Sequence, residues 1–383
     1  MKISFKIIYV FILLCIAFSQ KLYAVEKIKI GLLIPLSGSQ SEIGKSILQS
    51  VRLAVNKIDD PNIEIIPKDS KNDPFQTYLS AKELGLEGVK ITIGPVFYNN
   101  TTYLNELNQM TFLSLTNKTI KKTKNIISAG INATSQIKTI MQFIKMQNLQ
   151  RTIFLIPDSE FQDEIKGAIS KSKIKLKHTH IYETNPTKLT KQIEEITMYR
   201  IRKQNLLDEI KRLEDSNEQN KERKIKNLKK KDTIGGINFD SIIVSDFKEG
   251  LKSVFTSFLY TDISPQRVNY ITLNQWFDES FLKEKSLQPL YFPSINKKNY
   301  EEFIKNYNEI YNETPNQISF LSYDLMGFVY FLIYQNNFEI NEKIFYKKSQ
   351  FKGKVGIFEI NKNKINHILN FYKIENNQFK KIF

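Results

Sequence analysis

Blocks of apolar residues separated by polar loops predict strands and helices in turn along this chain. Residues 28–34 (IKIGLLI) are apolar at almost every position, which is typical of a strand that is covered on both faces. We expect Pro35 to end this strand, because proline has no N–H to donate to a neighbouring strand. From Ile43 to Ile58 apolar residues recur at helical spacing, so a helix with one stripe facing the sheet should follow.

The same alternation continues and then starts again near Ser135. In the first run, strands are predicted at 62–66, 90–93, 112–115 and 126–129, with helices at 75–86 and 101–110. In the second run, strands are predicted at 152–156, 174–182, 241–244 and 268–273, with helices at 135–147, 161–170 and 248–260. Later residues predict helices at 300–311 and 317–334 and an antiparallel meander from Ile357 to Ile382. Because strands that alternate with amphipathic helices build parallel sheets, we expect an α/β protein with two doubly wound lobes and a cleft between them.

A charged segment, residues 187–232, interrupts the second run. Its first part keeps apolar residues at helical spacing, but no apolar residue occurs from Glu214 to Lys224. This pattern predicts a charged helical hairpin that turns near Ser216 and protrudes from the core. Such a segment is either a solvated helical face or a docking surface for a partner protein, and the sequence leaves both interpretations open.

The first residues have the pattern of an export signal. Lys2 and Lys6 precede a run of twelve apolar residues from Ile7 to Phe18, and the small residue Ala24 follows at a suitable cleavage position. Twelve apolar residues fall short of the roughly 20 that span a bilayer, so we expect residues 1–24 to be a cleaved signal peptide and the protein to be periplasmic. An uncleaved N-terminal anchor is the alternative, and no other segment is expected to cross a membrane.

Charge and cysteine content exclude several classes of function. The formal net charge is +16, but the lysines are spread along the whole chain, whereas nucleic-acid-binding modules concentrate their charge on one face. We therefore expect no nucleic acid partner. Cys15 is the only cysteine and lies in the export signal, so the exported protein should have no disulfide, thiolate metal site or cysteine nucleophile.

Catalytic and metal-binding motifs are largely missing from the sequence. The chain has no Gly-x-Ser-x-Gly elbow, no Gly-x-Gly-x-x-Gly fingerprint and no phosphate-binding Gly-x-x-x-x-Gly-Lys-Ser/Thr loop. His178 and His180 lie two apart on a predicted strand and so share one face, but a metal site needs three or four ligands. Carboxylates are abundant, yet nothing positions a pair of them for hydrolysis. We expect a protein without catalytic residues, metal or cofactor.

The loop after the first strand is the first candidate for ligand binding. In open α/β sheets, ligands bind at loops that follow the carboxyl ends of strands, near helix N-termini. Ser37 and Ser39 lie in such a loop, directly before the predicted helix, and offer hydroxyl groups. The alternative is that these hydroxyls only cap the backbone amides of the helix.

The order of these segments resembles the type I periplasmic binding proteins, the group that contains the leucine/isoleucine/valine-binding protein. The resemblance depends on IGLLIPLSGSQSEIG (30–44), IGP (93–95), SLTN (114–117), FDSIIVSD (239–246), SYDLMG (322–327) and FKGKVGIFEINKN (351–363). The charged insertion, followed by DTIGGINFDSIIVSD, resembles the subgroup of penicillin-binding protein activators, in which a charged helical insertion lies at the same place. The similarity covers essentially the whole chain after the export signal.

This resemblance implies a two-lobed Venus-flytrap fold with three crossings between the lobes and no catalysis. The implied first lobe is residues 27–131 plus 290–348, and the implied second lobe is 132–289 plus 349–383. Two roles follow from the family. In the first, the protein binds a small polar ligand, such as an amino acid, and delivers it to an ABC-type permease. In the second, it regulates peptidoglycan synthesis by docking on a membrane-bound synthase through 187–232.

The resemblance also implies ligand-binding positions in both lobes. Thr116 and Asn117 match a carboxylate-binding loop, and Asp246 stands where the second lobe supplies an acidic residue for an ammonium group. Amino-acid-binding members have small hydroxyl residues after the IGP strand, but this chain has the bulky and amide-rich sequence VFYNN (96–100). We include Phe97, Tyr98, Asn99 and Trp276 as candidates that line the cleft, with core packing as the alternative for the aromatic residues. The rings of Phe97 and Tyr98 would fill space that a branched-chain amino acid needs, and Asp246 has a strand-end turn as its alternative role.

Overall fold

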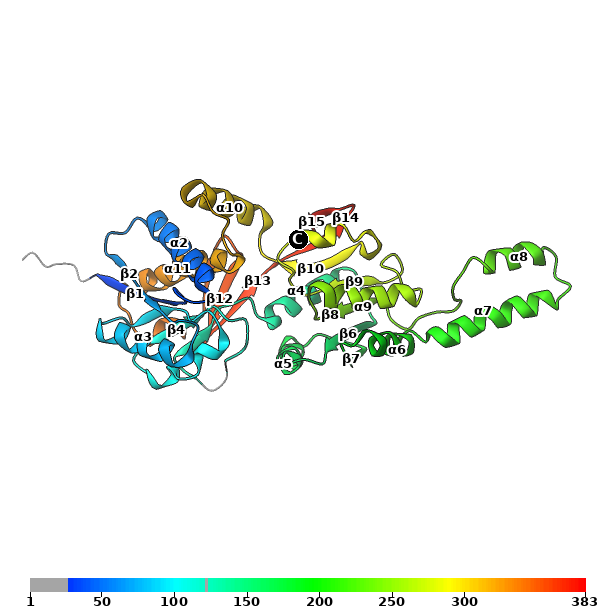
Figure 1. Cartoon of the computed structure of the whole chain (residues 1–383), viewed down its shortest axis with the longest axis horizontal. Coiled ribbons are helices and arrows are strands. Elements are labelled where there is room, and N and C mark those ends of the chain that lie inside the picture. Colours follow the sequence, from blue (N-terminus) through cyan, green and yellow to red (C-terminus); the bar gives the residue numbers. More distant parts are fainter. Residues whose placement is uncertain (1–26, 121–122) are drawn as a thin grey trace, which may run out of the picture.

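The structure is a computed structural model that describes residues 27–120 and 123–383. Two α/β lobes lie side by side, and a pair of helices projects from the second lobe as a long arm (Figure 1). The two-lobed α/β fold expected from the sequence is therefore confirmed. The expected signal peptide, residues 1–24, lies outside the described residues.

The first lobe is built on a parallel sheet in the order β2-β1-β3-β4-β5. Its strands are β1 (Ile28–Ile34), β2 (Ile63–Asp69), β3 (Ile91–Ile93), β4 (Thr111–Ser114) and β5 (Ile126–Ser128). The helices of this lobe are α2 (Ser41–Ile58), α3 (Pro74–Leu86), α10 (Lys297–Tyr311) and α11 (Gln317–Gln335). Successive side chains of a strand point to opposite faces, so Leu32 packs with the α2 and α11 side while Leu33 packs with the α3 side. Helices on both faces explain why β1 is apolar at almost every position.

Strand β2 continues past the residue at which the sequence predicts its end. The prediction stops at Ile66, before Pro67, but β2 runs to Asp69 and pairs Pro67 with Leu32 of β1. Strand β2 lies at the edge of the sheet, where one side of the backbone needs no partner. Proline is tolerated at such an edge because the N–H that it lacks is not needed by a second neighbour.

The second lobe is built on a mixed sheet in the order β15-β14-β10-β9-β8-β6-β7. Its strands are β6 (Thr152–Pro157), β7 (His178–Tyr182), β8 (Ser241–Val244), β9 (Asn269–Thr272), β10 (Leu290–Ser294), β14 (Asn370–Glu375) and β15 (Gln378–Lys381). The helices of this lobe are α4 (Ala133–Met146), α5 (Gln162–Ser172), α6 (Pro186–Ile196) and α9 (Lys248–Tyr260). Helices α4 and α5 pack with one face of the sheet and α6 and α9 with the other, which makes this lobe doubly wound like the first.

Two segments lie in a different lobe from the one expected. Strand β10 pairs with β9 and β14 of the second sheet, although residues 290–348 were assigned to the first lobe. Three further strands of the C-terminal meander form a separate antiparallel sheet: β11 (Ser349–Lys352), β12 (Ile357–Asn361) and β13 (Lys364–Ile368). Phe351 and Phe358 of this sheet pack against Phe328 of α11, so these strands lie with the first lobe and not with the second. The two-residue period predicts strands but carries no information about which sheet they join.

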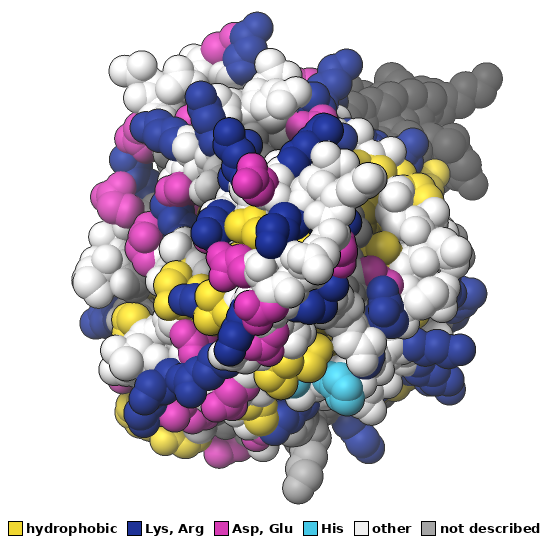
Figure 2. All heavy atoms as spheres, turned by 90° about the vertical axis from the view of Figure 1, so that its right-hand side faces the viewer, with side chains coloured by type: hydrophobic (Ala, Val, Ile, Leu, Met, Phe, Trp, Pro, Cys, Tyr) yellow, Lys and Arg dark blue, Asp and Glu magenta, His cyan; other side chains and the backbone are white. Residues whose placement is uncertain are grey.

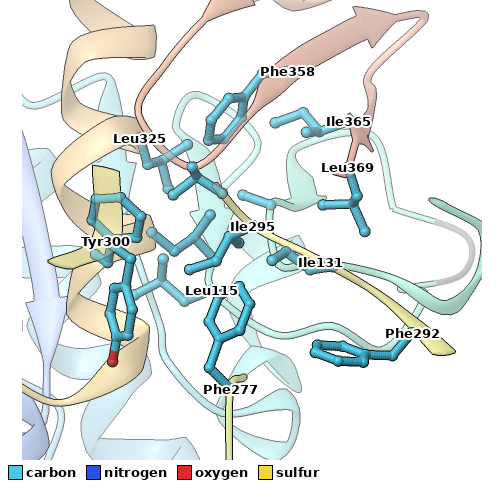
Figure 3. Close-up of a cluster of buried hydrophobic side chains, with 14 of the residues drawn as sticks. Leu115, Ile131, Phe277, Phe292, Ile295, Tyr300, Leu325, Phe358, Ile365 and Leu369 are labelled. Atoms are coloured by element: carbon cyan, nitrogen blue, oxygen red, sulfur yellow. The ribbon is translucent and has the colours of Figure 1, made fainter. Parts of the chain in front are cut away.

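With these segments assigned to the lobes in which they lie, the chain has three crossings between the lobes. The chain crosses between β5 and α4, between β10 and α10, and between β13 and β14. Buried apolar side chains from both lobes meet around the crossings, among them Leu115, Ile295 and Phe292 (Figure 3). The crossings are thus embedded in an apolar core and are not loose linkers.

The helix predicted at 101–110 is wrong. The structure has two short 3-10 turns there, η1 (Tyr98–Thr101) and η2 (Leu104–Glu106). Leu104, Leu107 and Met110 are buried at three-residue spacing, which a 3-10 turn satisfies as well as an α-helix does. Other 3-10 turns are η3 (Glu279–Leu282), η4 (Lys285–Leu287) and η5 (Glu342–Phe345).

The protruding segment is shorter than the charged segment defined by the sequence. Helix α6 packs against α9 and buries Leu189 and Ile193, so it belongs to the second lobe. The arm (residues 199–232) consists of α7 (Tyr199–Glu214) and α8 (Lys221–Leu228), and no residue of α8 is buried. On the face from which the arm projects, Lys and Arg are mixed with Asp and Glu over the surface (Figure 2). On this face the positive charge is therefore dispersed, as the sequence indicates.

One helix contradicts the expectation that no segment after the export signal could cross a membrane. Within the described residues, α11 is long and apolar enough to cross a membrane, with a mean hydropathy of 1.2 over a window of 18 residues. This window is 61% buried, and the helix packs against α2 inside the first lobe. Its apolar composition is explained by burial in the core.

Candidate ligand-binding cleft

A cavity of about 990 Å³ lies between the lobes and is lined by residues from both. In the first lobe the lining comes from the loops after β3 and β4 and from the start of α11. In the second lobe it comes from the start of α5 and from the loops after β8 and β9. These loops follow the carboxyl ends of parallel strands, where open α/β sheets bind ligands.

The wall in the first lobe depends on a glycine. Gly94 follows β3 and has a φ of +111°, a conformation that L side chains rarely adopt. A Cβ atom at this position would lie 2.1 Å from the carbonyl oxygen of Leu33 on the neighbouring strand. Only glycine allows this close approach, after which the chain turns and presents Phe97, Tyr98 and Asn99 to the cleft.

The wall in the second lobe is held by a network around Asn274. The backbone N–H of Asn274 donates to the side chain of Gln136 on α4 at 2.8 Å. Its side-chain oxygen accepts from the hydroxyl of Ser294 and from the backbone N–H of Trp276, both at 2.8 Å. Trp276 and Phe277 have φ values of +51° and +59°, and non-glycine residues in this region cost of order 1 kcal/mol each. A strained loop that is held by buried amides is typical of a functional site.

An ion pair joins the lobes at the cleft. The ammonium of Lys118, after β4, lies 3.3 Å from the carboxylate of Glu160, at the start of α5. The same ammonium lies 4.6 Å from the ring centroid of Phe161 and 5.6 Å from that of Tyr98, so it also makes cation–π contacts. Next to this pair, Thr119 donates from its backbone N–H and its hydroxyl to Glu164 on α5, at 3.0 and 2.7 Å.

Six of the nine candidate site residues line the cleft. These are Phe97, Tyr98, Asn99, Thr116, Asn117 and Trp276. The structure brings them together from three loops that lie between positions 97 and 276 of the sequence. Their part in binding stays a prediction, but core packing is not the role of Tyr98, whose side chain is exposed.

Ser37 and Ser39 do not line the cleft. The hydroxyl of Ser37 donates to Asp69 at the end of β2 at 2.6 Å, and the backbone N–H of Leu36 donates to the same carboxylate at 2.8 Å. Burial acts to raise the pKa of Asp69, but these hydrogen bonds outweigh it and hold the pKa below its usual value. Ser37 thus fixes the loop to the edge strand, whereas Ser39 is exposed. Neither residue makes a side-chain cap of α2.

Asp246 is engaged inside the second lobe and is not among the residues that line the cleft. Its carboxylate accepts from the hydroxyl of Tyr182 on β7 at 2.6 Å and from the backbone N–H of Phe247 at 2.8 Å. Burial, together with this carboxylate, raises the pKa of Tyr182. Because each carboxylate oxygen can accept more than one hydrogen bond, the assignment of Asp246 as the partner of a ligand ammonium stays a prediction.

Sequence reasoning missed several residues of the cleft. Phe247 follows Asp246 directly, so the rule that placed Asp246 at a strand end points equally to Phe247. Phe161 lies in the loop after β6 and could have been found in the same way. Gln317 reaches the cleft from the start of α11, and no local signal indicates this position.

His367 lies in the apolar region of the crossings. Its ring is buried, packs on Phe358 at 4.6 Å between ring centroids, and makes a hydrogen bond through Nε2 to the carbonyl oxygen of Ala129 at 2.9 Å. Its backbone N–H donates to the hydroxyl of Ser135 at the start of α4. Burial lowers the pKa of His367 to about 4, more than the bond to Ala129 raises it, so the ring is neutral near pH 7. His367 thereby ties β13 to the crossing between β5 and α4.

The histidine pair on β7 has no third partner for a metal ion. The ring centroids of His178 and His180 are 6.0 Å apart. Burial, and secondarily the charge of His178, lowers the pKa of His180. Over residues 27–120 and 123–383, no group of three or more His, Cys, Asp or Glu is arranged to hold a metal ion.

Comparison with known proteins places this geometry in a known fold. Residues 27–194 match a family model described as periplasmic binding protein. No curated protein sequence matches the chain. The LpoA (YraM) C-domain from Haemophilus influenzae, described as a regulator of PBP1A, has a TM-score of 0.64 at 14% identity, covering 93% of this chain and all of that one. Full-length LpoA is longer, and the match covers 59% of it.

Transport proteins have the same fold. A branched-chain amino acid ABC transporter periplasmic ligand-binding protein from Burkholderia xenovorans has a TM-score of 0.64 at 12% identity, covering 93% of this chain and 95% of that one. The branched-chain amino acid substrate-binding protein LivJ from Streptococcus pneumoniae, in complex with isoleucine, has a TM-score of 0.52 at 18% identity, covering 92% and 98%. Identities this low establish a shared fold and nothing about a shared ligand.

Proposed function

This chain has the fold of the type I periplasmic binding proteins, and from this premise we propose that it is an exported protein that binds a small polar ligand between its lobes without catalysis. The observation that carries the proposal is the cavity of about 990 Å³ between the lobes, with aromatic and amide side chains in its lining. Pockets of roughly 300–1,000 Å³ with few, well-placed polar groups are typical of ligand sites. None of the three histidines lines this cavity, and the described residues that do line it include no Ser–His or Cys–His pair.

The arrangement of the lobes supports binding by closure. Three crossings connect the lobes, and residues of both walls belong to the same cavity. A ligand that touches both walls stabilises the closed arrangement by the difference between its affinities for the closed and open forms. In a transport role, the closed form would be presented to an ABC-type permease in the membrane.

A second candidate function is favoured by the arm. It projects from the second lobe on the side away from the first lobe (Figure 1), and α8 buries no residue. The shared fold of LpoA, described as a regulator of PBP1A, is consistent with a role in which the arm docks on a membrane-bound peptidoglycan synthase. In this role the cleft need not bind anything.

Thermal denaturation of residues 27–383 with candidate ligands tests the first function. A ligand that binds the folded form raises Tm by mass action, with about 2.7 kcal/mol of stabilisation at 100 times Kd. We expect a saturable rise with one class among amino acids, short peptides and saccharides, and its loss in Trp276→Ala. If no class raises Tm, the binding function is contradicted, and the docking function becomes the better account.

A further inference from the structure

Exposed aromatic side chains gather around the cleft. Tyr98 is 40% exposed, Phe161 42% and Phe247 48%, and all three belong to the lining. Tyr98 comes from the first lobe, and the two phenylalanines come from the second. Phe97 and Trp276 add two half-buried rings. Exposed apolar rings that converge on one cavity mark a contact surface for a ligand, since scattered exposed rings would not share a cavity.

The uncharged polar groups left for a ligand are mainly amides. The buried amides of Gln136 and Asn274 are used inside the protein, in the network that holds the Trp276 loop. Asn99 and Asn117 are exposed in the cleft, and no side-chain hydrogen bond of theirs occurs in the described part of the chain. Gln317 has only a long contact, 3.4 Å, with the carbonyl oxygen of Trp276. An amide both donates and accepts, which matches hydroxyl groups better than a fixed charge.

Fixed charges in the cleft are poorly arranged for an amino acid. Lys118 of the first lobe is paired with Glu160, and the other charged residues of the lining, Lys248, Asp278 and Glu279, all belong to the second lobe. The described lining contains no arginine for bidentate binding of a carboxylate. The first-lobe wall therefore offers no unpaired charge, so a zwitterion held between the two walls would give up the hydration of two charges and meet unpaired charges on one wall only. The cavity is also at the upper end of the range for drug-sized ligands, which leaves room for more than one ring.

We infer that the ligand is a neutral saccharide of one or a few rings. The apolar faces of its rings would stack on Tyr98, Phe161 and Phe247, because the C–H groups of a sugar face carry partial positive charge and an aromatic face is negative. Its hydroxyl or acetamido groups would exchange hydrogen bonds with Asn99, Asn117 and Gln317. This inference deepens the proposed function and rests on it. Free sugars and fragments of a glycan strand share this chemistry, and the test separates the two sources.

Trp276 provides the test, because it is the only tryptophan in the chain and it lines the cleft. Residues 27–383 are titrated with cellobiose, with a tetramer of N-acetylglucosamine, with leucine and with glutamate, while tryptophan fluorescence is recorded. We expect a saturable change with a saccharide and none with either amino acid. Tighter binding of the tetramer indicates a glycan source, and tighter binding of cellobiose indicates a free sugar; either supports the inference. Saturation by leucine or glutamate overturns the saccharide class and keeps the proposed function. A flat response to all four, with no shift in Tm, contradicts both.

Matched variants test the stacking itself. Phe247→Ala removes an exposed ring from the lining, and we expect it to weaken saccharide binding at least tenfold. Phe75→Ala removes an exposed ring from α3, outside the cleft, and should leave the affinity unchanged. Both side chains are largely exposed, so Tm without ligand checks that each variant folds. Equal affinity of Phe247→Ala and the unchanged protein overturns the inference.

Discussion

Lys118 and Glu160 approach to 3.3 Å across the cleft, one from each lobe. The pair is flanked by the rings of Tyr98 and Phe161, which also belong to different lobes. The arrangement shown here is therefore stabilised at the cleft by side chains of the protein itself. A ligand that enters the cleft therefore meets lobes that these contacts already hold in the arrangement seen here.

Removal of this ion pair should shift the lobes toward an open form. Glu160 is largely exposed, so the pair contributes at most about 1 kcal/mol. The cation–π contacts of Lys118 add about 0.5–1 kcal/mol. Together these terms correspond to roughly a tenfold change in the ratio of open to closed molecules. Small-angle scattering of Lys118→Met should give a larger radius of gyration.

Lys252→Met is the matched control for this change. Lys252 pairs with Glu249 and Glu284 and lies 5.6 Å from the ring centroid of Phe281, all within the second lobe. Its removal costs a similar set of contacts without touching the cleft, so the radius of gyration should not change. An equal increase in both variants would show that general loosening, and not opening of the cleft, is measured.

The pH dependence of stability should contain a term from His367. Burial lowers the pKa of His367 to about 4, so the unfolded chain takes up a proton first as the pH falls from 6.5. This contribution of His367 lowers the free energy of unfolding over this window, by about 3 kcal/mol at pH 4 and below. His367→Gln should remove this loss, because an amide does not titrate. Urea midpoints at pH 4, 5, 6 and 7 test this, and an unchanged pH profile in the variant would contradict the neutral buried ring.

Asp324 should contribute a term of the opposite sign. It lies inside α11, accepts the backbone N–H of Val355, and burial raises its pKa to about 6. The folded protein therefore holds a proton that the unfolded chain releases near pH 3.8, so stability falls as the pH rises through 6, by about 3 kcal/mol. Asp324→Asn should remove this fall.

The opposite effects of His367 and Asp324 on stability can be tested together. The losses of stability from His367 on acidification and from Asp324 on alkalinisation overlap between pH 4 and 6 and largely cancel. We expect a flat profile for the unchanged protein in this window and opposite slopes for the two single variants. Slopes of the same sign would contradict one of the two assignments.

Deletion of the arm separates the two candidate functions. The backbone N–H of Ile234 donates to the carbonyl oxygen of Arg202 at 3.1 Å, so the two ends of the arm are adjacent. Residues 204–232 can be replaced by two glycines, which keeps Arg202 and its hydrogen bond to Thr261. We expect an unchanged Tm and unchanged ligand response, because α8 buries nothing and the two buried leucines in the deleted part of α7, Leu206 and Leu213, do not belong to the hydrophobic cores of the lobes. Loss of binding to a peptidoglycan synthase with the fold intact would support docking, and loss of the fold would show that the arm is structural.

Local patterns predicted most of the fold. Strand β1 and helix α2 follow from apolar period and proline placement, and the same rules located both doubly wound lobes. The failures are of two kinds. At 101–110 the three-residue spacing of apolar residues fits both an α-helix and a 3-10 turn. At Pro67 the strand continues because β2 lies at the edge of the sheet, and the sequence does not reveal that position. The lobes of β10 and of β11–β13 were predicted wrongly, because strand patterns do not specify which sheet a strand joins.

The site was predictable in position but not in chemistry. The family resemblance indicated Thr116, and Tyr98 and Trp276 were candidates as aromatic residues; all three lie in loops after strands, and these loops line one cleft. The partner of Asp246 is Tyr182, which is 64 residues away, so its use inside the lobe could not be read from neighbouring residues. The contact of Lys118 with Glu160 likewise depends on how the two lobes face each other.

The proposed function requires the lobes to close on a ligand, and a distance between the lobes tests this closure most directly. Without residues 1–24 the chain has no cysteine, so Leu86→Cys on α3 and Lys171→Cys on α5 give one spin label on each lobe. The distance distribution is then measured by double electron–electron resonance with and without the ligand that changes Trp276 fluorescence. The account predicts a shorter and narrower distribution at saturation, and a distribution that does not change with saturating ligand would contradict it.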